Sequence, residues 1–352
     1  MTEQPSANQI VIGVDTHDLV HVAVAVDHLG RRLGDLSIPT SPSGYEHFVT
    51  WASGLGEIFV VAMEGTGSYG HALCTVLRSR GVHVAEVSRP SRKDRRNHGK
   101  TDLSDPESAA RAFLGGKVTA KPRGNDASVA MIRSLRIPRE ALVNQRTQAI
   151  NQLRALIVMA PAELRESLAG LTAKQLIEQV AHFRVGSVTS PAEASRFAMR
   201  QLGRHVLHID VQVEGLDRQL NPLVAGRAPE LLAIYGVGVE VASNLLVAWD
   251  NAHRIRSEAA FASLCGVAPV PASSGKTNRH RLSRGGDRIA NRALWRIVLT
   301  RMRTDKRTRD YLVRRQAEGK SKREVVRCLK RYVAREVYHA LQSSSPTPSV
   351  SA

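Results

Sequence analysis

Short apolar runs alternate with amphipathic segments over the first 113 residues. Residues 9–27 predict two strands rich in β-branched residues, separated by a polar turn from Thr16 to Asp18. Residues 30–41 predict a third strand, at a sheet edge. The expected elements that follow are a helix over 43–56 closed by Gly54 and Gly56, a strand over 57–64, a helix over 68–81, a strand over 82–88 and an alanine-rich helix within 98–113.

This order of elements, β-β-β-α-β-α-β-α, predicts an α/β layer with a mixed sheet. It is the order of the ribonuclease H fold. We therefore expect an α/β domain at the N-terminus, followed by a mainly α region, because strand patterns become scarce beyond Gly116.

Helical periodicity dominates the middle of the chain. Leu142, Ile150, Leu153 and Leu156 recur at helical spacing and predict a long amphipathic helix. Residues 125–225 fit two interpretations equally well, a partly coiled-coil insert that mediates self-association or a plain helical bundle.

A glycine-containing turn separates two short helical patterns in residues 229–249. The turn Tyr235-Gly236-Val237-Gly238 resembles that of a helix-hairpin-helix, whose amides at a helix N-terminus approach a phosphate. Gly236 and Gly238 are therefore candidate nucleic-acid contacts. A loop over 266–286 and basic helices through Gln342 follow, and we expect a disordered tail over 343–352.

The charge is distributed unevenly and indicates a polyanionic partner. The 352 residues carry a formal net charge of +18. Residues 1–88 contain four Lys/Arg and nine Asp/Glu, whereas residues 276–335 contain twenty-one Lys/Arg and five Asp/Glu. Such a basic surface favours nucleic acid, with binding that is salt-sensitive and largely independent of sequence.

Other features point to a cytoplasmic, nucleoid-associated protein without a membrane partner. No apolar run reaches the roughly 18 residues that a membrane span needs, and the first residues lack the pattern of a signal peptide. Cys74, Cys265 and Cys328 are odd in number and have no metal-ligand spacing, so we expect reduced thiols.

Two carboxylates stand at the ends of apolar strands. Asp15 lies in "IVIGVDTH" and Glu64 ends "FVVAME". A buried carboxylate without a partner is costly, so each position requires a reason such as a metal or a capping role. If the two strands are neighbours, their ends lie about 5 Å apart and the carboxylates could share a cation.

Asp102 and Asp105 are three residues apart, a spacing that places two side chains on one helix face. Pro106 leaves two alternatives: either Asp105 is the N-cap with proline as the first helical residue, or the helix begins near Asp102 with proline in its first turn. Taken alone, the two aspartates fit simple capping, to which Glu107 adds favourable charge.

Together, the four carboxylates favour a metal site. Hard oxygen ligands suit Mg²⁺ or Mn²⁺, and a pair of such ions supports phosphodiester chemistry. Basic residues just upstream could hold a nucleic-acid backbone, and the candidates are Arg92, Lys93, Arg95, Arg96 and Lys100.

Five segments of the chain resemble the DEDD transposases of bacterial insertion sequences, a family that includes Piv-type invertases and bridge-RNA-guided recombinases. The segments are "GVDTH", "MEGTGSYGHAL", "KTDLSDPESAA", "FASLCGVAPVPASSGK" and "LSRGGDRIANRAL", and they occur in family order between about residues 10 and 305. The resemblance implies a RuvC-like catalytic domain over 1–122, a helical or coiled-coil region over 123–225 and a C-terminal transposase domain over 226–342.

The resemblance also implies roles for individual residues. The metal-binding tetrad falls on Asp15, Glu64, Asp102 and Asp105, and the nucleophilic serine on Ser274, with Ser273 as its less favoured neighbour. The family usually has alanine where this chain has Pro106. Around the serine, the candidate nucleic-acid contacts are Lys276, Arg279, Arg281 and Arg284.

The implied partners are donor and target DNA, a bridge RNA and further copies of the chain as a dimer or tetramer. Base pairing would read the sequence while the protein grips backbones, which suits a basic chain with 4% aromatic residues. Two alternatives stay open, a RuvC-like junction-resolving nuclease that needs no serine and a catalytically inactive nucleic-acid-binding protein.

Overall fold

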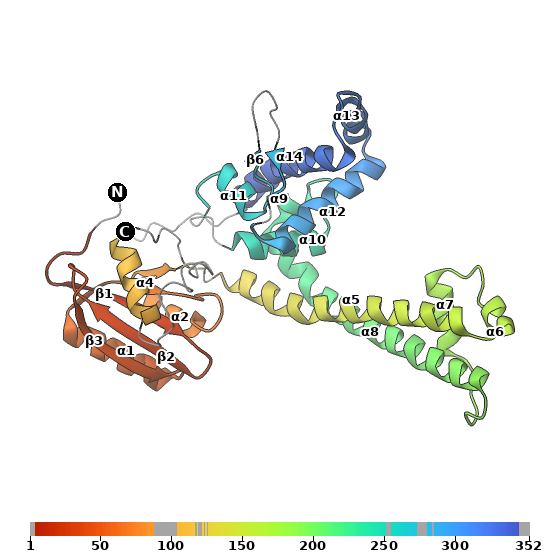
Figure 1. Ribbon diagram of the computed structural model, residues 1–352, viewed down its shortest axis with the longest axis horizontal. Helices are drawn as coiled ribbons and strands as arrows, with labels where there is room; N and C mark the ends of the chain where they lie inside the picture. The colour runs from red at the N-terminus through yellow and green to blue at the C-terminus, as the bar shows by residue number, and fades with distance from the viewer. Residues whose placement is uncertain are drawn as a thin grey trace. The chain divides into compact units, whose positions relative to one another are not determined.

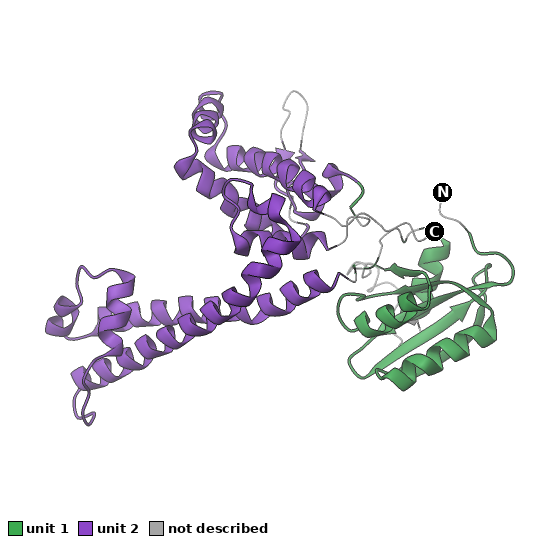
Figure 2. Ribbon diagram, turned by 180° about the vertical axis from the view of Figure 1, so that it is seen from behind, with its two compact units in different colours: residues 1–125, 251–256 green, residues 126–250, 257–352 purple. Residues whose placement is uncertain are grey.

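The protein consists of two compact units (Figure 2). The computed structural model describes residues 4–87, 104–116, 118, 122, 124, 126–250, 255–272, 280–283 and 285–344, with Ser104 described by its backbone alone. The first unit comprises residues 1–125 and 251–256, and the second comprises residues 126–250 and 257–352. Each unit is described by itself.

A five-stranded mixed sheet forms the centre of the first unit. Its strands are β1 (Gln9–Thr16), β2 (Val20–Val26), β3 (Arg32–Pro39), β4 (Glu57–Met63) and β5 (Val84–Glu86). The order across the sheet is β3-β2-β1-β4-β5. The pairs β3–β2 and β2–β1 are antiparallel, whereas β1–β4 and β4–β5 are parallel. The prediction of an edge strand at β3 is confirmed.

Helices cover both faces of this sheet (Figure 1). On one face, α1 (Pro42–Leu55) and α2 (His71–Ser79) pack against a core that includes Ile12 and Met63. On the other face, α4 (Ser104–Leu114) packs against Val11 and neighbouring small residues. Alternate side chains of a strand point to opposite faces, and both faces are covered, so β1 is apolar from Ile10 to Val14.

The described elements follow the predicted order, and a mixed sheet is present as expected. One boundary is wrong. Gly54 lies inside α1, which ends at Leu55 with Gly56 as its C-cap. The helix continues through Gly54 because Ala52, one turn from its end, is fully buried and anchors that turn on the sheet.

A long helical hairpin occupies the first part of the second unit. It pairs α5 (Ala127–Met159) with α8 (Pro191–Arg227), and bidentate ion pairs join Arg139 to Asp217 and Arg146 to Asp210. Partner numbers fall along α8 as they rise along α5, so the helices run antiparallel.

The far end of the hairpin holds its own apolar core. The short helices α6 (Ala162–Ser167) and α7 (Ala173–Ala181) pack there around Leu153, which is fully buried. The predicted long helix through Leu153 is confirmed and extends well beyond the predicted residues. A coiled-coil role for it stays a prediction.

The rest of the second unit is mainly helical, as predicted. Its elements are α9 (Pro229–Leu232), α10 (Val239–Trp249), α11 (Glu258–Leu264), β6 (Val270–Pro271), β7 (His280–Arg281), α12 (Arg288–Thr304), α13 (Lys306–Ala317) and α14 (Lys322–Ser343). An aromatic cluster of Trp249, Phe261 and Tyr338 joins α10, α11 and α14. Across the described ranges, no helix is both long and apolar enough to cross a membrane. Residues 345–352 of the predicted tail lie outside the described residues.

Candidate active site and nucleic-acid surface

Asp15 and Glu64 lie at the ends of two neighbouring parallel strands. The register of β1 with β4 pairs Val14 with Met63, so the next position along each strand is Asp15 on β1 and Glu64 just beyond β4. Neighbouring strands are about 4.8 Å apart. The two strands are therefore neighbours, which is the condition under which Asp15 and Glu64 could share a cation.

Both carboxylates belong to the sheet face that α4 covers. Residue alternation relates Asp15 to Val11, and Glu64 to Val60 and Ala62, and these three apolar residues form one core with Ala110 of α4. The side chain of Asp15 is 19% exposed. The carboxylates thus continue an apolar face at the point where it opens to solvent.

Gly13 allows the beginning of α4 to lie directly on β1. A Cβ at this position would stand 1.7 Å from the carbonyl oxygen of Pro106 and 2.9 Å from the amide nitrogen of Ala110, both backbone atoms. Only a glycine permits this approach. Because Gly13 is two residues from Asp15, the contact holds the first turn of α4 close to the end of β1 that carries Asp15.

Asp105 lies inside the first turn of α4, which begins at Ser104. The alternative in which Asp105 is the N-cap is therefore wrong, and Pro106 follows it within the helix. Pro106 is tolerated there because the amides of a first helical turn have no partner within the helix. A helix start near Asp102 stays a prediction. Asp102, the remaining member of the tetrad, lies outside the described residues.

Local hydrogen bonds tie the two strand ends together. Thr16 donates its hydroxyl to the backbone oxygen of Glu64 at 3.1 Å. His17 Nε2 lies 3.0 Å from Asp15 Oδ2, so the imidazole orients one oxygen of this carboxylate. The turn after Glu64 depends on Gly65, whose φ of +64° favours glycine.

The described carboxylates share a face but do not by themselves form a closed metal site. Among the side chains that the structure describes, no three His, Cys, Asp or Glu residues are grouped closely enough to hold a metal ion. The oxygen donors nevertheless have the chemistry that Mg²⁺ and Mn²⁺ prefer.

Most of the predicted basic contacts and both candidate serines cannot be placed. Arg92, Lys93, Arg95, Arg96, Lys100, Ser273, Ser274, Lys276, Arg279 and Arg284 lie outside the described residues. The strands β6 and β7 flank residues 273–279 on both sides and pair Val270 with Arg281. These two strands pair antiparallel, and the predicted serine segment itself lies outside the described residues.

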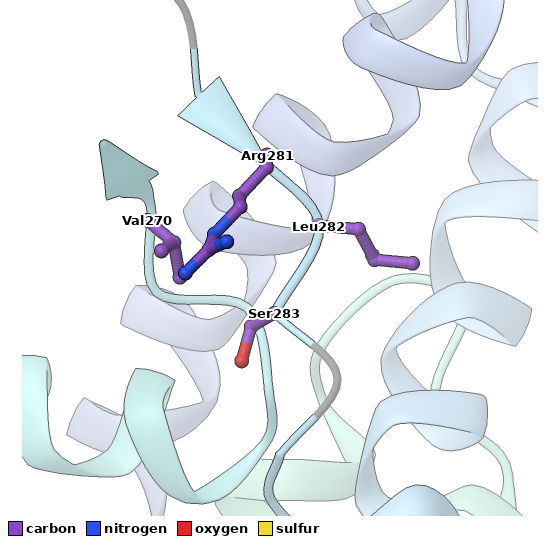
Figure 3. Close-up of a pocket in the computed structure, with 4 residues that line it drawn as sticks. All are labelled: Val270, Arg281, Leu282 and Ser283. Carbon is purple, nitrogen blue, oxygen red and sulfur yellow. The ribbon is translucent and has the colours of Figure 1, made fainter. Parts of the chain in front are cut away.

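A cavity of about 600 Å³ lies beside this hairpin, lined by Val270, Arg281, Leu282 and Ser283. Figure 3 shows the guanidinium of Arg281 reaching across to Val270, with the hydroxyl of Ser283 on the same side. Arg281 is thus the one predicted basic residue of the serine loop whose position is described.

The predicted glycine turn is fixed to α12. Gly236 has a φ of +87°, and a Cβ there would lie 3.4 Å from the backbone oxygen of Ile297. Arg301 donates to the carbonyl of Tyr235 at 2.9 Å and also pairs with Glu336 of α14. Gly238 is the exposed N-cap of α10. The helix before the turn, α9, is only four residues long.

Sequence reasoning missed two residues of this site. Gly13 had a signal, since a glycine inside an apolar strand marks a close approach of another backbone. His17 had none, because a histidine two residues after an aspartate is usual in a polar turn.

Comparisons with known proteins cover both units. Residues 12–160 match the model of the DEDD transposases of the IS110 type, described as a transposase, and residues 228–313 match the transposase family IS116/IS110/IS902. The chain is similar to the "Insertion element IS110 uncharacterized 43.6 kDa protein" of Streptomyces coelicolor, with 25% identity over 366 residues and 89% of each chain covered. The matched segments include the two strand-end carboxylates, the beginning of α4 and the hairpin. The chain therefore belongs to the IS110 family of DEDD transposases, the DNA-cutting enzymes of insertion sequences.

Proposed function

We propose that the protein is a site-specific DNA recombinase that cuts and rejoins DNA to mobilise its own insertion sequence. One observation carries this proposal: the parallel pairing of β1 with β4 brings Asp15 and Glu64 to adjacent strand ends on the face that the first turn of α4 crosses.

The residues present fit a divalent metal ion by their chemistry. Asp15, Glu64 and Asp105 offer hard oxygen donors from three elements that meet around Gly13, and Asp102 would supply the fourth. Bound there, Mg²⁺ or Mn²⁺ would stabilise negative charge on a DNA phosphate. The chain's own contribution is to hold these carboxylates in place, through the Gly13 contact and the hydrogen bond of His17.

A ribonuclease H-like, RuvC-like architecture for the first unit agrees with this role. The support is the sheet order β3-β2-β1-β4-β5, with carboxylates at the ends of the central strands. In that architecture the two central parallel strands carry the catalytic carboxylates, and the other strands support them.

The second unit would supply the nucleophile and the basic residues that bind DNA. Ser274 is the proposed nucleophile, and its oxygen would attack a DNA phosphate, form a phosphoserine link and release a 3′ or 5′ hydroxyl. A serine hydroxyl is weak by itself and needs activation. In the sequence, Ser274 falls between the paired strands β6 and β7, and Arg281 of β7 is a basic side chain that would hold phosphate charge.

A bridge RNA is part of the proposal as the reader of DNA sequence. The second unit carries the basic residues needed to hold nucleic-acid backbones. We further propose that several copies of the chain act together. Sequencing the RNA that co-purifies with the protein tests the guided mechanism, because its loops should match both DNA partners; the absence of RNA would contradict it.

An excision and insertion assay of the parent insertion sequence tests the central proposal. Asp15→Ala and Ser274→Ala should each abolish recombination. Ser283→Ala, which removes another hydroxyl beside the hairpin, is the matched control and should retain it. Recombination by Ser274→Ala at the wild-type level would contradict the serine mechanism.

Detection of a covalent adduct separates a recombinase from a nuclease. The recombinase should trap DNA on the wild-type protein but not on Ser274→Ala. A junction-resolving nuclease on the same fold would cut DNA without any adduct, and a catalytically inactive binding protein would do neither.

A further inference from the structure

The helix α13 differs from its neighbours because it contributes almost nothing to the core. Of its twelve residues only Thr308 is buried, whereas α12 and α14 each bury several apolar side chains. A helix this exposed gains little stability from packing. Core packing therefore does not explain the basic sequence of α13.

Local interactions keep α13 helical without a core. Asp305 caps its N-terminus by accepting from the amide of Thr308 at 2.8 Å. Tyr311 packs edge-on against Tyr332 of α14, with ring centroids 5.9 Å apart, and the guanidinium of Arg314 lies over its ring. These contacts fix the inward side of the helix, and Arg314 lies at the margin between the inward and outward sides.

Basic residues line both margins of the outward side. Helical periodicity places Arg307 and Arg314 on one margin and Arg309 on the other, with Lys306, Asp310 and Val313 between them. Within the described residues neither Arg307 nor Arg314 forms an ion pair, and the guanidinium of Arg314 lies over the ring of Tyr311. Lys306 pairs with Asp310 on the open surface, where such a pair contributes little.

Val313 stands at the middle of this side and is 68% exposed. Between the basic margins, Val313 adds an apolar side chain beside the Lys306–Asp310 pair. Basic margins suit the phosphates of two strands, and an apolar side chain between them suits the edges of bases, including the thymine methyl group.

We propose that the outward side of α13, made by Lys306, Arg307, Arg309, Val313 and Arg314, binds in the major groove of duplex DNA. A helix with its side chains is about 10–12 Å wide, which matches the roughly 12 Å groove of B-form DNA. The major groove of A-form RNA is too narrow and deep to admit it. The single turn residue between α12 and α13, Asp305, makes α13 project as a separate helix.

This inference rests on the proposed function only in taking DNA as the substrate. Its test measures binding in EDTA, where no divalent ion is available and no strand is cut. A loss of catalysis in the tetrad variants and a loss of binding in the α13 variants are therefore separate results.

The first experiment removes charge from α13. Fluorescence anisotropy with a 30-base-pair DNA duplex gives the affinity of the full chain over a range of salt concentrations. Arg307→Ala/Arg314→Ala should weaken binding about tenfold or more and reduce the slope of log K against log salt by about 2, because each phosphate contact contributes about 0.9.

The matched control removes two exposed charges at the far end of the helical hairpin. Lys174→Ala/Arg184→Ala should leave both the affinity and the slope nearly unchanged. An equal loss in the control would show that net charge alone governs binding, and an unchanged slope in the α13 variant would overturn the proposal.

The second experiment tests the groove. Val313→Glu puts a carboxylate at the centre of the outward side and should weaken DNA binding severalfold more than Val188→Glu, a change at another exposed valine. The wild-type protein should prefer DNA to an RNA duplex of the same sequence, and Val313→Glu should lose this preference. Equal effects of the two glutamates, or a greater effect of the α13 variants on RNA than on DNA, would contradict groove binding.

Discussion

Residues 1–88 carry nine acidic and four basic side chains, whereas residues 276–335 carry five acidic and twenty-one basic ones. The acidic segment forms the sheet of the first unit, where a Cβ on Gly13 would stand 1.7 Å from the backbone oxygen of Pro106. The basic segment builds helices whose charges lie mostly on exposed faces.

The difference follows from what each charge has to do. Carboxylates that share a metal ion, as proposed for Asp15 and Glu64, must be placed within a fraction of an ångström, and these two stand where strands and a helix meet. Basic residues that meet phosphates act through many weak contacts and tolerate more freedom. A single substitution in the first unit, the sheet unit, should therefore have a large effect on stability or activity. A single substitution in the second, helical unit should have a smaller effect.

Gly13→Ala should have the largest effect on stability. Its Cβ would overlap the backbone of Pro106, which no side-chain rotation can relieve, so we expect a loss of about 3 kcal/mol or more. Urea denaturation measures it, and recombination should fall with it. Gly54→Ala in α1, where a Cβ meets nothing within 4 Å, should instead stabilise by up to about 1 kcal/mol. Similar results for the two variants would refute the backbone contact.

Gly236→Ala and Gly238→Ala sharpen the comparison in the helical unit. Gly236 has a φ of +87°, so alanine should cost about 1–2 kcal/mol of unfolding free energy. Gly238 has a φ of −98° and open space around it, so alanine should barely alter stability. If the exposed amides of α10 meet phosphate, Gly238→Ala should still lower DNA affinity. Unchanged affinity would remove Gly238 from the binding surface.

The smallest effect concerns the pH dependence of the sheet unit. Burial lowers the pKa of His21, which is fully buried and stacked on Tyr45. The unfolded chain then binds more protons below the ordinary value of 6.5, so the unfolding free energy should fall as pH drops from 7 toward the lowered pKa. His21→Phe should flatten this decline in urea titrations at several pH values. The exposed His47→Gln should leave it unchanged, and an equally steep decline in His21→Phe would contradict the assignment.

The sequence was sufficient for the elements whose signals are local. The β-branched runs of β1, β2 and β4 and the amphipathic spacing around Leu153 each determine their own conformation. The positions of Asp15 and Glu64 at strand ends were also predictable, because polar residues interrupt apolar runs there.

Other features depend on contacts that no local pattern contains. The residue that Gly13 meets, Pro106, is more than ninety positions away, so the approach was not predictable from the strand alone. The antiparallel pairing of α5 with α8 is made by contacts between residues far apart in the chain, such as Leu153 with Met199 in one apolar core and Arg139 with Asp217 in an ion pair. The exposure of α13 could not be foreseen either, since its mixed basic and apolar sequence also fits a packed helix.

The measurement closest to the central claim compares chemistry and binding in one variant. Asp15→Asn keeps the size of the side chain and its contact with His17 while removing the negative charge. DNA affinity measured by anisotropy should be retained, and recombination of the parent insertion sequence in Mg²⁺ should fall at least about a thousandfold. Recombination within tenfold of wild type, or a parallel loss of DNA binding, would contradict the division of labour between the two units.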